Sequence, residues 1–113
     1  MSTKTWVSPV VLAAALGAAG CALENVGAPV NGTVFVSIKD NLFQPESLTV
    51  QQGVSVRWTN DGGILHSVVQ DSGKWQSPLL SPTAWFDVRF DTLGTYSYHC
   101  SLHPEMTGTV VVQ

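Results

Sequence analysis

From Thr33 onward, apolar and polar residues alternate along the chain with a period of two. The clearest run is "AWFDVRFD" at positions 84–91, in which every second side chain from the first to the seventh is apolar. Alternation of this kind is typical of a β-strand with one buried face and one solvated face. Further runs that predict strands lie at 33–39, 47–50, 54–60, 66–70, 95–100 and 109–112.

The segments between these runs are rich in glycine, proline, aspartate and serine, which mark turns. No segment after Gly32 shows a helical period. Strands with one solvated face favour antiparallel pairing. Seven or eight short strands in about 80 residues therefore predict an all-β protein, a Greek-key β-sandwich. Two sheets are needed because a single sheet could not bury both the aromatic and the aliphatic rows.

The first 20 residues follow a different pattern from the rest of the chain. They begin with a basic residue, Lys4, continue with an uncharged apolar stretch at 7–20, and end in small residues. The stretch is too short to span a bilayer comfortably. A buried helix would be expected to carry a polar face, and this stretch has none. Residues 1–20 therefore resemble a secretory signal, and we expect a periplasmic or other extracytoplasmic protein.

The end of the signal and the residue after it read "AAGC" at positions 18–21, which resembles the lipobox of bacterial lipoproteins. That resemblance implies lipidation of Cys21 and attachment to a membrane surface, although Ala18 stands where leucine is usual. Three alternatives remain: Cys21 stays free after export, it is removed with the signal, or it forms a disulfide with Cys100. Residues 21–32 are rich in small residues and predict a flexible tether. Residues 33–113 then form one domain.

Composition narrows the classes of partner. The 113 residues are 44% hydrophobic and 12% charged, which is typical of a globular protein rather than a disordered one. The formal net charge is −3, so nothing suggests binding to nucleic acid. We expect a monomer.

The candidate chemistry lies in "CSLHPEM", where Cys100, His103 and Met106 are spaced three residues apart. His66 opens an earlier predicted strand and could reach the same end of a sandwich. Each residue alone is more often structural than functional. Together they supply one thiolate, two imidazoles and one thioether, the ligand set of a blue-copper site with a weak axial methionine. The pattern therefore predicts a copper site.

Residues 41–113 resemble the cupredoxins, in particular the amicyanin-like and plastocyanin-like members. The resemblance rests on "DNLFQPESLTVQQGVSVRWTND", "LHSVV" and "GTYSYHCSLHPEMTGTVVV". It implies one type 1 copper ion that carries single electrons, bound by His66, Cys100, His103 and Met106. It also implies that the ring edge of His103 is the electron port, within a small apolar patch formed with Leu102 and Pro104. The expected partners are redox proteins such as a dehydrogenase, a cytochrome or an oxidase.

Two positions depart from the family pattern. Ser67 stands where many members have an asparagine that links the two ligand loops, and the 81–83 turn, "SPT", lacks a common glycine. His99 resembles a position that bridges to a second copper in nitrite reductases, but such a site needs further histidines, and the chain has only His66, His99 and His103. We therefore expect His99 to be an outward strand residue, and we expect no enzyme. The alternative function is an extracytoplasmic copper carrier or storage protein, because the same motif would bind Cu(I).

Overall fold

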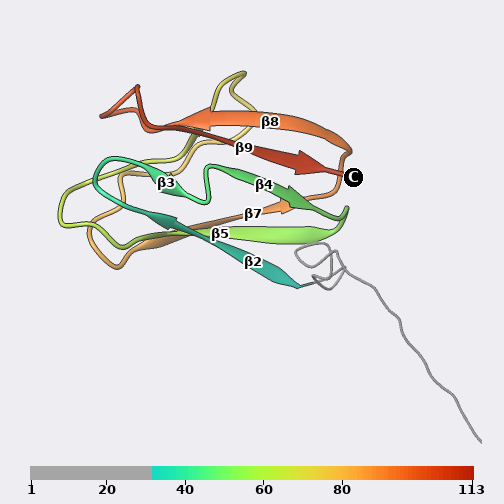
Figure 1. Ribbon diagram of the computed structural model, residues 1–113, viewed down its shortest axis with the longest axis horizontal. Coiled ribbons are helices and arrows are strands. Elements are labelled where there is room, and N and C mark those ends of the chain that lie inside the picture. The colour runs from blue at the N-terminus through green and yellow to red at the C-terminus, as the bar shows by residue number, and fades with distance from the viewer. Residues whose placement is uncertain (1–31) are drawn as a thin grey trace, which may run out of the picture.

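The computed structural model describes residues 32–113, which form eight strands and no helix (Figure 1). The longer strands carry the alternating burial that the sequence pattern predicts; the strand Val54–Asn60 alternates between buried and half-buried side chains along its whole length. The strands are β2 (Thr33–Ile38), β3 (Phe43–Gln44), β4 (Ser47–Val50), β5 (Val54–Asn60), β6 (Val69–Gln70), β7 (Trp85–Phe90), β8 (Gly94–His99) and β9 (Thr107–Val112).

The eight strands form two four-stranded sheets that stack as layers, in the orders β3-β2-β5-β7 and β4-β9-β8-β6 (Figure 1). The prediction of an all-β sandwich is confirmed. The expectation of antiparallel pairing is wrong for two strand pairs, because β2 pairs with β5 and β4 pairs with β9 in parallel. The chain passes from β3 to β4 in the other sheet before it returns as β5. Alternation reports which face of a strand is buried, and it carries no information about strand direction.

The core between the sheets is built around Trp58, which is fully buried. Its ring lies 5.3 Å from that of Tyr98 and 5.4 Å from that of Trp75, measured between centroids. Trp75, which is half-buried, also packs against Phe90 at 5.9 Å and helps to close the sandwich. Burial of each such side chain contributes about 2 to 3 kcal/mol. This packing holds the two sheets together. The loops that carry the candidate site extend from one end of these sheets.

The segment that contains His66 is less regular than the sequence pattern predicts. A strand was expected at 66–70, but regular pairing is confined to Val69–Gln70. His66 is instead held by an isolated antiparallel bridge to Leu80. The two-residue strand β3 was not expected, because a run of two residues shows no period.

Several predictions concern residues that the structure does not describe. The predicted signal at 1–20, Cys21 and all but the last residue of the tether at 21–32 lie outside the described residues. Within 32–113 no helix has the length and hydropathy of a membrane span.

Candidate metal centre

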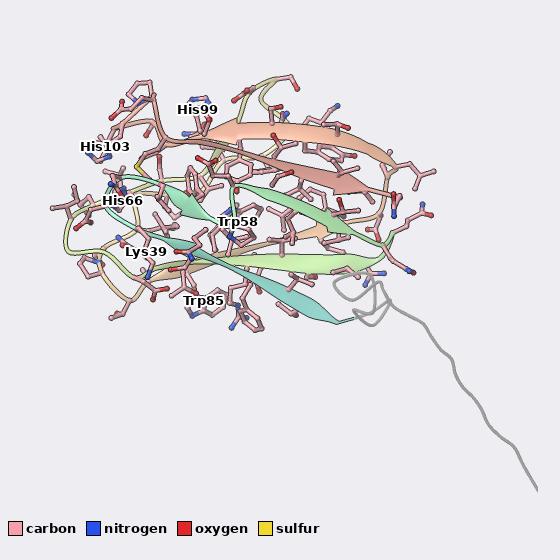
Figure 2. All side chains as sticks on the ribbon, viewed as in Figure 1. Lys39, Trp58, His66, Trp85, His99 and His103 are labelled. Atoms are coloured by element: carbon pink, nitrogen blue, oxygen red, sulfur yellow. The ribbon has the colours of Figure 1, made fainter. Side chains whose placement is uncertain are left out.

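Two loops bring the candidate ligands to one end of the sandwich, opposite the carboxyl terminus (Figure 1). Cys100 follows β8 directly, and Met106 immediately precedes β9. His66 lies in the segment between β5 and β6. Figure 2 shows His66 and His103 as neighbours at this end. Because β8 and β9 are adjacent in one sheet, the short loop between them must return within a few residues, which concentrates its side chains.

Three of the four predicted ligands lie together in the structure. The Sγ atom of Cys100 lies 3.8 Å from Nδ1 of His66 and 3.6 Å from Nδ1 of His103. The ligand atoms of these three residues all lie within 4.8 Å of one another. Both imidazoles present the same nitrogen to the sulfur, which leaves each Nε2 facing away. This is a convergent set of donors around one point.

The ligand loop is closed by its own backbone. The N–H of Cys100 donates to the carbonyl of Met106 at 3.1 Å, and the N–H of Met106 donates to the carbonyl of His103 at 2.8 Å. The side chain of Met106 is only 2% exposed. Below the loop, Gly108 lies against the ring of Tyr98, where a Cβ would approach within 2.4 Å. The loop is therefore seated on a close contact between β8 and β9.

Ser67 links the two ligand-bearing loops. Its Oγ accepts a hydrogen bond from the N–H of Ser101 at 2.8 Å and lies 2.7 Å from Oγ of Ser101. Its own N–H donates to Sγ of Cys100 at 3.4 Å. A serine at this position thus supplies the connection that an asparagine supplies in many cupredoxins. It also places a hydrogen-bond donor on the candidate thiolate ligand.

Sequence reasoning missed Asn60, which organises the loop that carries His66. The buried Nδ2 of Asn60 donates to the carbonyls of Ile64 and Leu80, both at 2.8 Å, and its Oδ1 accepts from the N–H of Gly62 at 2.9 Å. Leu80 in turn exchanges two backbone hydrogen bonds with His66. The only sequence signal is an asparagine at the end of the buried row of the strand predicted at 54–60.

Sequence reasoning also missed Asp40, which lies 26 residues before His66. One carboxylate oxygen, Oδ1, lies 3.1 Å from Nε2 of His66. The N–H of Gly63 donates to the same carboxylate at 2.9 and 3.2 Å. The hydrogen bond to His66, and then the one from Gly63, hold the pKa of Asp40 below its ordinary value. No local motif at Asp40 reveals this contact.

His99 does not join the cluster. Its Nδ1 lies 2.7 Å from Oδ1 of Asp71, on the outer side of β8 (Figure 2). This agrees with the expectation that His99 is an outward strand residue. Its ring is therefore already engaged in a surface contact with a carboxylate.

The predicted electron port lies at the surface. His103 is half-buried, Pro104 is exposed and Leu102 is 47% exposed. Leu65, which precedes His66, is also largely exposed. Because the rings of His66 and His103 lie 5.1 Å apart, these leucines belong to the same end of the molecule. Apolar side chains therefore flank the accessible edge of the site.

The donor set fits a copper ion. One buried thiol and two imidazole nitrogens converge within a few ångströms, and soft thiolate with imidazole ligands suits copper in both oxidation states. The hydrogen bond between Ser101 and Ser67 and the backbone hydrogen bonds within the ligand loop hold the segments that carry these donors.

Comparison with known proteins agrees with this chemistry. The family described as "Cupredoxin-like domain" matches residues 10–112. Amicyanin-alpha of Methylorubrum extorquens is 37% identical over 97 residues, which cover 81% of this chain and 82% of that protein. The structure of a purple cupredoxin from Nitrosopumilus maritimus matches with a TM-score of 0.66 and 29% identity, over 71% of this chain and 99% of that one.

An enzyme is also among the structural neighbours. A copper-containing nitrite reductase from Thermus scotoductus matches with a TM-score of 0.68 and 26% identity, over 72% of this chain but only 22% of that one. The match to amicyanin-alpha, by contrast, covers most of both proteins. The sequence, the fold and the converging donors together show that this chain belongs to the cupredoxin-like family, with one type 1 copper ion as its cofactor.

Proposed function

We propose that this protein carries single electrons between redox partners outside the cytoplasm. Its copper ligands are His66, Cys100 and His103, with Met106 as the weak axial ligand. The observation that carries the proposal is the convergence of one sulfur and two Nδ1 atoms within 4.8 Å. When bound, the copper ion supplies the chemistry by exchanging one electron between Cu(II) and Cu(I).

The protein's own contribution is to hold the ligands still. Ser67 connects the two loops through Ser101, and the backbone of the ligand loop closes between Cys100 and Met106. Donors that do not move between oxidation states leave little reorganisation to accompany electron transfer. The N–H of Ser67 directed at the Cys100 sulfur stabilises negative charge on that atom.

The electron leaves through the exposed edge of His103. Leu102 and Pro104 form a small apolar surface beside that edge. A small apolar surface supports the brief, weak encounters that redox partners make. The partner is a dehydrogenase, a cytochrome or an oxidase, and the carrier works as a monomer.

Absorption spectroscopy of the purified, copper-loaded protein tests the proposal. A type 1 site shows an intense visible band from thiolate-to-copper charge transfer, and Cys100→Ser should abolish it because a hydroxyl cannot replace the soft thiolate. Cys21→Ser is the matched control and should retain the band. Copper that binds only as Cu(I), without a visible band, would refute electron transfer and favour the copper carrier or storage function.

The axial role of Met106 is tested by the reduction potential. Met106→Gln should keep copper bound and lower the potential, because an amide oxygen is a harder ligand that favours Cu(II). An unchanged potential would mean that Met106 is not axial.

A copper content above one ion per chain would instead support an enzymatic function that involves His99.

We also propose that residues 1–20 direct export and that Cys21 is lipidated, which anchors the domain to a membrane surface through the tether at 21–32. Support comes from the lipobox-like "AAGC". One acyl chain binds membranes weakly, whereas two or more anchor stably. Mass spectrometry of the mature amino terminus tests this. An unmodified terminus downstream of Cys21 would refute lipidation and leave export by an ordinary signal.

A further inference from the structure

Asp40 is the only carboxylate within the described residues that makes a hydrogen-bonded contact with a candidate copper ligand. It lies in the turn that follows β2, where the N–H of Lys39 donates to the carbonyl of Leu42 at 2.8 Å. Figure 2 shows Lys39, the preceding residue, at the same end of the molecule as His66. The turn thus brings a charged group to the back of the buried histidine ring.

The carboxylate of Asp40 is held in place by a second segment. The N–H of Gly63 donates to both of its oxygens, at 2.9 and 3.2 Å. A Cβ at Gly62 would lie 2.1 Å from Oδ1 and 2.9 Å from Cγ of Asp40, so any larger residue there would displace the carboxylate. The sequence "GG" at 62–63 therefore forms a seat for this side chain. Its position is defined by more than its contact with the ring.

The contact determines which nitrogen of His66 carries the proton. A carboxylate accepts hydrogen bonds, so Oδ1 of Asp40 requires an N–H at Nε2 of His66. The lone pair is then left on Nδ1, which faces the sulfur of Cys100 at 3.8 Å. His66 is 0% exposed, so water does not compete for its ring. Carboxylate partners of this kind orient metal-ligating histidines and make them stronger donors.

We propose that Asp40 is a positioning residue of the copper site, which fixes the Nε2–H tautomer of His66 and lowers the reduction potential. This proposal rests on the proposed function, because it takes His66 as a ligand. A negative charge behind the ring favours the more positive oxidation state. Asp40 is 53% exposed, so solvent screens part of this effect.

Four variants separate the charge from the hydrogen bond, and one of them, Asp40→Ala, removes both. Asp40→Asn removes the charge and keeps an acceptor of similar size. Gly62→Ala keeps the charge but pushes the carboxylate away from the ring. Asp61→Asn is the matched control, because it removes one charge from a nearby exposed residue whose side chain contacts Ser37 and no ligand.

The first readout is the reduction potential by protein-film voltammetry. Asp40→Asn should weaken binding of Cu(II) about tenfold relative to Cu(I), which corresponds to a rise of about 59 mV for a one-electron couple. Gly62→Ala should raise the potential by less, and Asp61→Asn should raise it least. Equal shifts in Asp40→Asn and Asp61→Asn would overturn the tuning role.

The second readout needs no copper. Ring nitrogen chemical shifts of His66 in the metal-free protein report its tautomer, which should be Nε2–H in the wild type and in Asp61→Asn. Asp40→Ala and Gly62→Ala should give a mixture of both tautomers. A pure Nε2–H form in Asp40→Ala would overturn the positioning role. Because this measurement does not depend on the visible band, a failure here is distinguishable from a failure of the proposed function.

Discussion

The two candidate histidines lie in different segments: His66 between β5 and β6, which we call the His66 arm, and His103 in the loop between β8 and β9, which we call the His103 arm. The two arms differ sharply in the contacts that hold them. His66 is fully buried, and its backbone is bonded to Leu80. Asn60 fixes the loop before it, and Asp40 contacts the far side of its ring. These contacts involve segments from three separate parts of the chain. The His66 arm is therefore part of the folded scaffold.

The His103 arm is held almost entirely by its own loop. The backbone carbonyl of His103 accepts a hydrogen bond from the N–H of Met106, and its Nδ1 approaches Sγ of Cys100. Its ring is half-buried and lies beside the exposed Leu102. One ligand is thus fixed by the core while the other meets the surface. If the proposed function holds, the buried side of the site would set the geometry and the exposed side would exchange electrons.

Removing each imidazole in turn is the most severe test of the comparison. His66→Gly and His103→Gly should both lose the visible band. Added imidazole should restore the band in His103→Gly, because its cavity opens to solvent. It should not restore the band in His66→Gly, because that position is 0% exposed. Equal recovery in both variants would contradict the distinction, and circular dichroism checks that each variant is folded.

Asn60→Ala should weaken the buried arm through stability. The substitution leaves the carbonyls of Ile64 and Leu80 without their side-chain donor. We expect the free energy of unfolding of the metal-free protein to fall by about 3 kcal/mol. Asn41→Ala, at an exposed asparagine, should change it by less than about 0.5 kcal/mol. Denaturant titration measures both, and equal losses would show that Asn60 does not organise the loop.

Below the His103 arm, the ring of Tyr98 lies against Gly108. This tyrosine should make the free energy of unfolding depend on alkaline pH. Burial raises the pKa of Tyr98 to about 12. The unfolded chain, with a tyrosine pKa of about 10, then loses this proton first. The free energy of unfolding should therefore be unaffected by this group below pH 10 and should fall by roughly 2 kcal/mol as the pH rises to 12. Tyr98→Phe should remove that loss, whereas Tyr96→Phe should retain it.

The smallest expected effect is at Thr83, whose N–H donates to the carbonyl of Asn60 at 2.8 Å. Its φ of 76° is unfavourable for a β-branched residue. Thr83→Gly should therefore stabilise the turn behind the His66 arm by about 1 kcal/mol. Thr92→Gly, where φ is not positive, should destabilise the protein slightly. Thermal unfolding of the two variants distinguishes them, and a loss of stability in both would contradict the strain at Thr83.

Much of the fold and the centre of the site follow from the sequence alone. A period of two depends only on which face of a strand is buried, so the strands and the all-β class could be predicted locally. Cys100, His103 and Met106 lie in one short loop, so their proximity follows from chain connectivity. The copper cofactor follows from the chemistry of those donors together with the family match.

Other features depended on the tertiary structure. The predicted antiparallel direction was wrong for the β2–β5 and β4–β9 pairs, because the alternation of apolar residues does not show where the chain crosses between sheets. The contacts of Asp40 and Ser67 join residues 26 and 34 positions apart, and hydrogen bonds over such separations have no local signature. The sequence alone predicted which side chains would bind copper. Only the packing of loops from different strands decided which polar groups stand behind those atoms and hold them.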